Sequence, residues 1–421
     1  MDVFLAGGIF VAAYALIASE RFDRTLVALL GGLLVIALGI VSQEEAFAAI
    51  DLNVIFLLAG MMVLAGGLKQ TGFFDFLAGH AIRLSRGQPF RLLIMLAIVT
   101  AGLSALLDNV TTVVLLTPVT LSIARRIRVS PVPYLVSEIF ASNIGGTATL
   151  IGDPPNILIG SAAGLDFADF LVNLAPVVFV ILGAFLLIMW VAFGRSMEDD
   201  ADRLDILAEL DPGAAITDRR LMIRALIVLG LTIVGFVVHS ALHLEAATIA
   251  LLGATVLMLF GPLDPHKALN DVEWRTLFFF IGLFMLVEAV VHVGIVAGIA
   301  DAMAQAAGGR LDIATIGILW FSALASAVVD NIPYTATAIP IVERLVASGL
   351  QADPLWWALS LGACLGGNLT IVGASANIVV ANLATRDGHP ITFTLFFRYG
   401  LAVVAASLAI STVYLWVRYL A

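Results

Sequence analysis

Long apolar runs separated by short polar segments dominate this chain. Runs of about 17 to 25 apolar residues match the thickness of a bilayer core when they are helical. Eight runs of 15 to 24 residues, close to this length, stand out: Val3–Ala18, Leu26–Val41, Asn53–Leu68, Leu171–Phe193, Met222–His239, Ala246–Phe260, Leu277–Val293 and Thr394–Val417. The pattern predicts an all-α polytopic membrane protein.

Two further stretches in each half are interrupted by polar residues. Phe90–Arg126 is apolar on both sides of the cluster Ser104–Thr112, which fits a re-entrant helical hairpin or two full spans. Tyr134–Ala162 contains Asn143–Asn156, where glycines and prolines break a helix. Non-helical backbone at membrane depth is tolerated only where it is buried in protein or lines a wet cavity. This discontinuous helix therefore predicts a site.

The composition agrees with a membrane protein. Of 421 residues, 61% are hydrophobic and 12% are charged, which is more apolar surface than a soluble core can bury. The first run lacks a basic segment and a cleavage site, so we expect a retained helix instead of a signal peptide. The single cysteine, Cys364, excludes a disulfide framework and a multi-thiolate metal site. We predict no metal, cofactor or catalytic residue.

The chain matches itself at a constant offset. Asp108-Asn109 falls on Asp330-Asn331, an offset of 330 − 108 = 222, and Gly145-Gly146 falls on Gly366-Gly367 after one deletion, at 221. We therefore predict two repeats, residues 1–194 and 222–421, joined by a charged cytoplasmic linker at 195–221. An odd number of crossings in each repeat makes them inverted, with about 10 transmembrane helices, two re-entrant hairpins and two discontinuous helices. Inverted repeats place broken helices around one site near the midplane.

Basic residues predict the orientation. All but three of the 21 lysines and arginines, the exceptions being Arg310, Arg344 and Arg418, fall on one side of this topology. The positive-inside rule makes that side cytoplasmic and puts both termini on the outer face of a plasma (bacterial inner) membrane. We expect no lysine or arginine near the hairpin tips, so a multiply charged anion would lack a counter-charge there.

Polar residues of the hairpins and broken helices are the candidate site. An ionised carboxylate within an apolar stretch costs several kcal/mol unless it is paired, hydrated or bound to a cation. The alternative is that Asp108 and Asp330 only cap the helices that follow. Threonines there could likewise bond only to their own helix carbonyls. The predicted substrate-binding residues are Asp108, Asn109, Thr111, Asn143, Gly145, Gly146, Thr147, Thr149, Asp330, Asn331, Gly367, Asn368 and Thr370.

One carboxylate breaks the repeat. Asp153 falls opposite Ala374, so we predict that it carries the coupling proton or cation, alone or with Asp108 and Asp330. The alternative is a turn-forming aspartate before Pro154. Glu288 is a weaker proton-relay candidate, and Glu138, near a helix start, is expected to be a terminal charge. Cys364 could contact the substrate or be a small packing residue.

Four segments resemble a known family. They read ALLDNVTTVVLLTPVTLSIARR, SNIGGTATLIGDPPNILIG, VVDNIPYTATAIPIVERL and GACLGGNLTIVGASANIVVA. They resemble the ion transporter superfamily, in its branch of ArsB arsenite efflux and P-protein-like permeases, over nearly the whole chain. The resemblance implies the inverted-repeat fold and a ligand held between the hairpin tips and the unwound loops. Dicarboxylate carriers of the superfamily have a Ser-Asn-Thr tip, whereas this chain has aspartate at the serine position.

Several functions compete. The leading hypothesis is proton-motive-force-linked efflux of arsenite or antimonite, which are uncharged at neutral pH. The alternatives are a sodium/proton antiporter, using H+ or Na+ at the same carboxylates, another anion transporter of the superfamily, and a passive channel. An intramembrane aspartyl protease is disfavoured because its Gly-x-Gly-Asp and Tyr-Asp contexts are absent. Partners compatible with the resemblance are a second copy in a homodimer and a soluble ATPase, with the lipid bilayer around them and no nucleic acid.

Overall fold

The protein is helical throughout the part that the structure describes. The computed structural model describes residues 2–19, 21–86, 88–194, 197, 212–261 and 263–421. Residues 195–196 and 198–211 of the predicted linker lie outside them. No strand occurs among the described residues.

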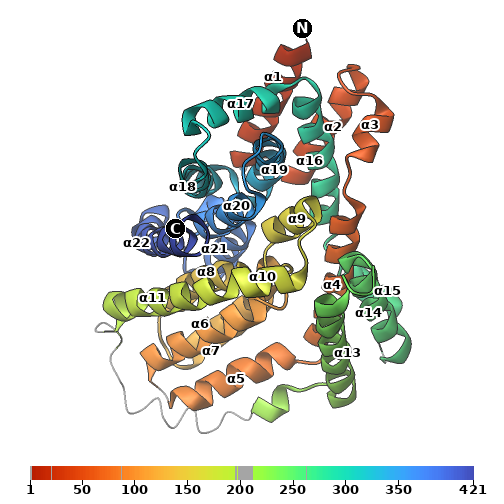
Figure 1. Cartoon of the computed structure of the whole chain (residues 1–421). Helices are drawn as coiled ribbons and strands as arrows, with labels where there is room; N and C mark the ends of the chain where they lie inside the picture. The colour runs from red at the N-terminus through yellow and green to blue at the C-terminus, as the bar shows by residue number, and fades with distance from the viewer. Residues whose placement is uncertain (1, 20, 87, 195–196, 198–211, 262) are drawn as a thin grey trace.

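The first half contains two hairpin arms and one broken helix (Figure 1). Its helices are α1 (Asp2–Ala18), α2 (Arg24–Ala37), α3 (Gln43–Ala48), α4 (Leu52–Lys69), α5 (Phe73–Ser85), α6 (Pro89–Ser104), α7 (Asn109–Arg126), α8 (Val132–Gly146), α9 (Pro154–Ala163), α10 (Phe167–Asn173) and α11 (Ala175–Phe193). The arms of the hairpin are α6 and α7, and the broken helix consists of α8 and α9.

The second half repeats this order. Its helices are η1 (Pro212–Ala215), α13 (Arg219–Val238), α14 (Ala246–Phe260), α15 (Pro265–Asn270), α16 (Trp274–His292), α17 (Ile295–Ala307), α18 (Leu311–Val329), α19 (Asn331–Ala347), α20 (Ala352–Gly366), η2 (Ile371–Gly373), α21 (Ser375–Arg386), α22 (Phe393–Leu415) and η3 (Trp416–Leu420). The arms of the second hairpin are α18 and α19, and the second broken helix consists of α20 and α21. The predicted fold class, an all-α membrane protein with two inverted-topology repeats, is confirmed.

Six of the described helices are long and apolar enough to cross a membrane. They are α4, α11, α13, α16, α18 and the segment of α22 with η3. A seventh is added if the bent pair of α9 and α10, which meet at 114°, counts as one span. Helices α1, α2, α6, α14 and α17 are apolar but shorter.

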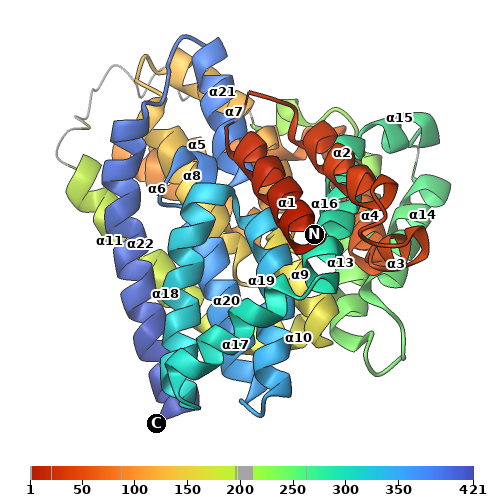
Figure 2. The ribbon, with the colours of Figure 1, turned by 90° about the horizontal axis from the view of Figure 1, so that it is seen from above.

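The helices form two groups. Helices α1, α2, α4, α13, α14 and α16 pack on one another, and we call them the first bundle. The hairpins and broken helices pack together with α11 and α22, and we call these the second bundle. Figure 2 shows the two bundles side by side. Helices α4 and α16 contact the second bundle, at α7 and α9 and at α19. Each bundle therefore contains helices from both repeats.

Close helix contacts obey the repeat at the level of single atoms. Gly60 of α4 packs against the backbone of Ala250 in α14, and Gly282 of α16 packs against that of Ala28 in α2. The offsets are equal, because 282 − 60 = 222 and 250 − 28 = 222. Small residues let membrane helices approach closely, which strengthens their van der Waals packing. The same crossing is therefore built twice, once from each half.

Replacing Gly60 or Gly282 with alanine is expected to destabilise the protein by about 1–3 kcal/mol, the usual cost of overpacking. An added Cβ would lie 2.7 Å from the carbonyl carbon of Ala250 or 2.5 Å from that of Ala28. Thermal unfolding of the purified protein in detergent measures the loss. The control is Gly183→Ala in α11, where a Cβ meets no other atom within 4 Å. Equal stability of all three variants would contradict the close crossing.

Candidate functional site

Each hairpin tip is an aspartate that caps the second arm. The Asp108 carboxylate accepts a hydrogen bond from the Thr111 backbone N–H at 2.8 Å, and Asp330 accepts one from Ile332 at 3.1 Å. The capping alternative therefore describes a real interaction at both tips. At the second tip, the other carboxylate oxygen of Asp330 accepts a hydrogen bond from the Ser375 hydroxyl at 2.7 Å.

The hairpin tips are tied to the breaks of the discontinuous helices in both halves. The hydroxyl of Ser104 donates to the Ser142 carbonyl at 2.7 Å, and that of Ser326 donates to the Ala363 carbonyl at 2.7 Å. The predicted site residues Thr149 and Thr370 also donate to hairpin carbonyls, at Ala105 and Ala327. In each of these two pairs of hydrogen bonds, the donors and the acceptors of the two halves differ by the repeat offsets of 221 or 222 residues. The tip and the break of one half therefore form one unit.

Two asparagines bind the carbonyls left open where each helix unwinds. The Asn156 amide donates to the carbonyls of Thr147 at 3.1 Å and Thr149 at 2.9 Å. At offset 221, Asn377 donates to the carbonyls of Gly367 at 2.8 Å and Thr370 at 2.9 Å. An unpaired buried carbonyl in a membrane costs several kcal/mol, so the hydrogen bonds from these amides stabilise the breaks.

Glycines allow the breaks to contact the hairpins. A Cβ on Gly145 would lie 2.1 Å from the Ala101 carbonyl oxygen, and one on Gly366 would lie 2.4 Å from that of Ala323. A Cβ on Gly146 would meet the carbonyl oxygen of Gly152, and Gly367 faces Gly373 in the same way. The predicted site glycines thus permit backbone contact.

Asp153 lies where the two halves meet. Its Oδ1 accepts hydrogen bonds from the Asn109 amide at 3.1 Å and from the Asn331 amide at 3.0 Å. These asparagines follow the two capping aspartates, one in each hairpin. Asp153 is fully buried, and its Oδ2 accepts no hydrogen bond from the described residues, with the Cys364 thiol next to the carboxylate. Asp153, which has no acidic counterpart in the second repeat, is therefore bound by both hairpin tips.

A chain of amides extends from this carboxylate. Asn143 accepts a hydrogen bond from Asn109 at 3.0 Å and donates to Asn368 and Asn377, each at 2.9 Å. Within the described residues, the buried Oδ1 of Asn109 and Nδ2 of Asn368 have no partner. Buried polar groups are rarely left unpaired, so an orphan group calls for a ligand, a solvent molecule or another function. With Asp153 Oδ2, one network contains two open acceptors and one open donor.

The predicted Thr147 and a second threonine, Thr335 of the second hairpin, bond to their own helices. Thr147 donates to the Asn143 carbonyl at 2.7 Å, and Thr335 donates to the Asn331 carbonyl at 2.7 Å. This is the back-bonding alternative. Thr111 enters the site through its backbone N–H, as the capping partner of Asp108. Cys364 is buried, with Sγ 3.5 Å from the Asn156 side-chain oxygen.

The expectation that no basic residue lies near the tips is wrong. Arg24, at the start of α2, lies 3.6 Å from the Asp330 carboxylate and donates a hydrogen bond to Ser375. Its guanidinium also lies over the Phe279 ring, 5.2 Å from the centroid. The sequence places Arg24 at the edge of an apolar run, where it counts as a flanking charge. The fold brings it from the first bundle to the second hairpin tip.

The expectation that Glu138 is a terminal charge is also wrong. Glu138 is fully buried in α8 and accepts a hydrogen bond from the Thr120 hydroxyl of α7. Glu288 is partly exposed on α16, one turn before His292. It lies on a helix of the first bundle, outside the hairpins and breaks.

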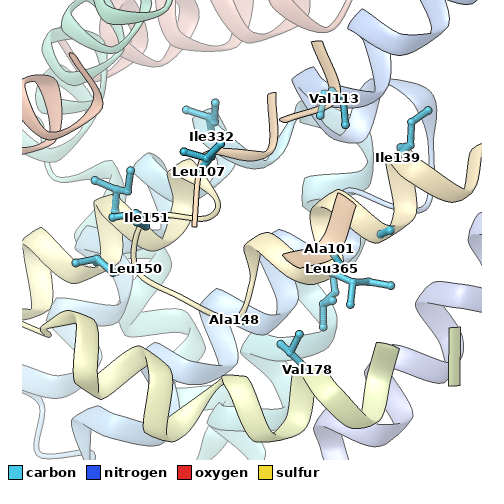
Figure 3. Close-up of a cluster of buried hydrophobic side chains, with 14 of the residues drawn as sticks. Ala101, Leu107, Val113, Ile139, Ala148, Leu150, Ile151, Val178, Ile332 and Leu365 are labelled. Atoms are coloured by element: carbon cyan, nitrogen blue, oxygen red, sulfur yellow. The ribbon is translucent and has the colours of Figure 1, made fainter. Parts of the chain in front are cut away.

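Buried apolar side chains lie on the same helices and breaks as the polar network. Figure 3 shows Ala101, Leu107, Val113, Ile139, Ala148, Leu150, Ile151, Val178, Ile332 and Leu365 from the hairpins, the first break and the helices packed on them. All of them are buried. A low-dielectric surrounding strengthens the hydrogen bonds of the network and raises the cost of any charge left unpaired.

Comparison with known proteins adds family information to this geometry. The sequence model of CitMHS, described as citrate transporter, matches residues 14–362. An uncharacterized transporter of Mycobacterium tuberculosis is 47% identical over 98% of this chain and 97% of its own length. The human P protein is 35% identical over 99% of this chain, which spans 60% of the P protein. The YdaH transporter of Alcanivorax borkumensis, whose topology is described as unusual, shares the fold with a TM-score of 0.61 at 14% identity. That match covers 99% of this chain and 98% of YdaH.

Proposed function

The chain belongs to the citrate transporter family CitMHS of the ion transporter superfamily, and we propose that it is a cation-coupled secondary transporter with Asp153 at its coupling site. One observation supports this proposal best. Both hairpin tips donate to one buried carboxylate whose second oxygen is open. A carboxylate held between two inverted halves can gain or lose a proton as either half moves.

Charge guides the proposal for the solute. The site contains Asp108, Asp153 and Asp330, and the one guanidinium in contact with them among the described residues is that of Arg24. Since Arg24 already pairs with Asp330, a free tricarboxylate such as citrate would meet uncompensated negative charge. A compact neutral solute avoids this repulsion. The two open acceptors and one open donor suit a small molecule with several hydroxyl groups.

We propose arsenite or antimonite as that solute, exported in exchange for protons. Trivalent arsenic at neutral pH is an uncharged trihydroxide, so it offers O–H donors to Asn109 Oδ1 and Asp153 Oδ2 and an acceptor to Asn368 Nδ2. The name of the family model, citrate transporter, is the alternative that this proposal must exclude. A sodium/proton antiporter is a second candidate, favoured by the two open oxygens of the network, Asp153 Oδ2 and Asn109 Oδ1.

Flux into proteoliposomes separates these three functions. We expect an imposed pH gradient to drive uphill accumulation of arsenite, measured by mass spectrometry, and a protonophore to abolish it. Labelled citrate and a sodium-dependent pH change should stay at the level of empty liposomes. Citrate accumulation would support the family description instead, and sodium/proton exchange without arsenite flux would support the second candidate.

We also propose the orientation predicted from the basic residues, with both termini on the outer face. Reporter fusions that are active only on one side of the bacterial inner membrane test it, when attached after Ala421. Activity of the cytoplasmic reporter at this position would contradict the orientation.

A further inference from the structure

A second buried carboxyl group lies outside the proposed coupling site. Glu138, in α8, accepts a hydrogen bond on Oε1 from the Thr120 hydroxyl of α7. Its other oxygen, Oε2, is buried and has no partner among the described residues. The hydroxyl of Thr117, one turn before Thr120 on α7, is also buried without a partner among the described residues. The α7–α8 interface therefore contains polar atoms that the proposed coupling at Asp153 does not use.

No opposite charge accompanies this carboxyl group. Helix α8 packs against α6, α7, α11, α20, α21 and α22. In the described part of α8 and these helices, the other titratable and charged groups are Arg91, Arg125, Arg126, Tyr134, Asp353, Cys364, Arg386, Arg398, Tyr399 and Tyr414, and Tyr134 donates to the Pro89 carbonyl. None of them forms a hydrogen bond or an ion pair with Glu138, whose described partner is Thr120. An isolated buried carboxylate is strongly destabilising, so this packing favours the protonated, neutral group.

The second repeat shows that packing does not require a carboxyl group here. At offset 221, Glu138 matches Leu359, and at offset 222, Thr120 matches Val342. Both of these residues are buried, and their helices α19 and α20 pack on each other as α7 and α8 do. The equivalent positions are thus apolar in the second half, while the first half has an acid and a hydroxyl there. The difference points to a function beyond packing.

Both helices that carry this pair also carry the proposed site. Helix α7 starts at Asn109, which binds Asp153, and α8 carries Asn143. Thr120 is 11 residues beyond Asn109, which is about 16 Å along a helix at 1.5 Å per residue. Glu138 is therefore separate from the site but attached to it through two rigid elements.

We propose that Glu138 is a second proton-binding site, whose deprotonation loosens the contact of α7 with α8 and thereby slows transport at alkaline pH. The proton passes between the Glu138 carboxyl group and water that enters the loosened interface. Protonated Glu138 leaves the interface of α7 and α8 neutral, just as the buried Leu359 leaves its position neutral in the other half. Deprotonated Glu138 places an unpaired charge in the contact and shifts the hairpin away from its binding geometry.

A glutamine at position 138 tests the proposal, because it mimics the neutral group. We expect Glu138→Gln to keep the wild-type arsenite flux into proteoliposomes at acidic pH. At alkaline pH, the arsenite flux of the wild type should fall and that of the variant should not. The difference infrared spectrum of the purified wild type minus the variant should show one protonated carboxyl C=O band that disappears at high pH. Glu44→Gln, at an exposed glutamate in the first turn of α3, is the control, for which we expect an unchanged pH profile and a difference spectrum without that band.

The spectrum does not depend on the identity of the solute, so it separates this proposal from the proposed function. A wild-type pH profile for Glu138→Gln, or an absent carboxyl band, would overturn the proposal. Should Glu138→Gln fold poorly, the double variant Glu138→Leu with Thr120→Val reproduces the apolar pair of the second repeat. This double variant should fold, and its arsenite flux should not fall at alkaline pH. A fall in its flux at alkaline pH would equally overturn the proposal.

Discussion

Asp153→Asn is expected to abolish uphill accumulation of the solute while leaving downhill counterflow intact. Asparagine keeps a side-chain oxygen that can accept the hydrogen bonds of Asn109 and Asn331, so the site retains its shape. It cannot bind and release a proton, however, and the gradient is no longer coupled to the solute. For one-to-one exchange, one pH unit supports about a tenfold concentration ratio, since it corresponds to about 1.36 kcal/mol. We expect this ratio to fall to unity.

Paired flux measurements in proteoliposomes check this prediction. Accumulation is measured with an imposed pH gradient, and counterflow is measured without a gradient, with unlabelled solute inside. The matched control is Asp301→Asn in α17, an aspartate on the surface that pairs with Arg344 at 3.5 Å. We expect the control to behave as wild type. Gradient-driven accumulation by Asp153→Asn would remove Asp153 from the coupling mechanism.

Arg24→Gln is expected to destabilise the protein by about 1–2 kcal/mol, through the charge that it leaves unpaired at Asp330. A fully buried pair would give more, but the Arg24 side chain is 30% exposed and partly screened by solvent. Asp330→Asn should have a smaller effect, because an arginine left alone can still be hydrated. The positive φ of 86° at this position strains asparagine no more than aspartate, so the substitution adds no backbone cost. The double variant should be close to Asp330→Asn alone.

A double-mutant cycle based on thermal unfolding measures this coupling. Arg344→Gln is the control, because both partners of that surface pair are more than half exposed and such pairs contribute little. Additive effects of Arg24→Gln and Asp330→Asn would show that the two residues do not interact. In that case the link between the first bundle and the second hairpin tip would have to be explained by Ser375 and Phe279.

Much of this fold could be predicted because membrane helices and their interruptions leave strong local signals. Apolar runs predicted α1, α4, α13 and α16, and the Gly-Pro segment predicted the break before Pro154. The repeat offset also isolated Asp153 as the position without a counterpart. Helices α5 and α17 were missed, because they are short and carry charged residues such as Arg83 and Asp301, unlike a span.

The missing parts of the site depend on tertiary contacts. Arg24 starts an apolar run, and only the packing of the two bundles brings it to Asp330. Glu138 lies in the second turn of α8, and it is buried by helices that are distant in sequence. Likewise, the offset indicates that Asn109 and Asn331 are equivalent, but only the fold brings both amides to one carboxylate oxygen.

The location of the solute is tested most directly by an anomalous-difference map at the arsenic absorption edge, from crystals of the transporter soaked in arsenite. The anomalous signal identifies arsenic without reference to the surrounding protein. We predict one peak between the hairpin tips, in contact with Asp153 Oδ2 and with the open amide groups of Asn109 and Asn368. A map with no peak there, or with arsenic bound only elsewhere on the protein, would contradict a solute site at Asp153.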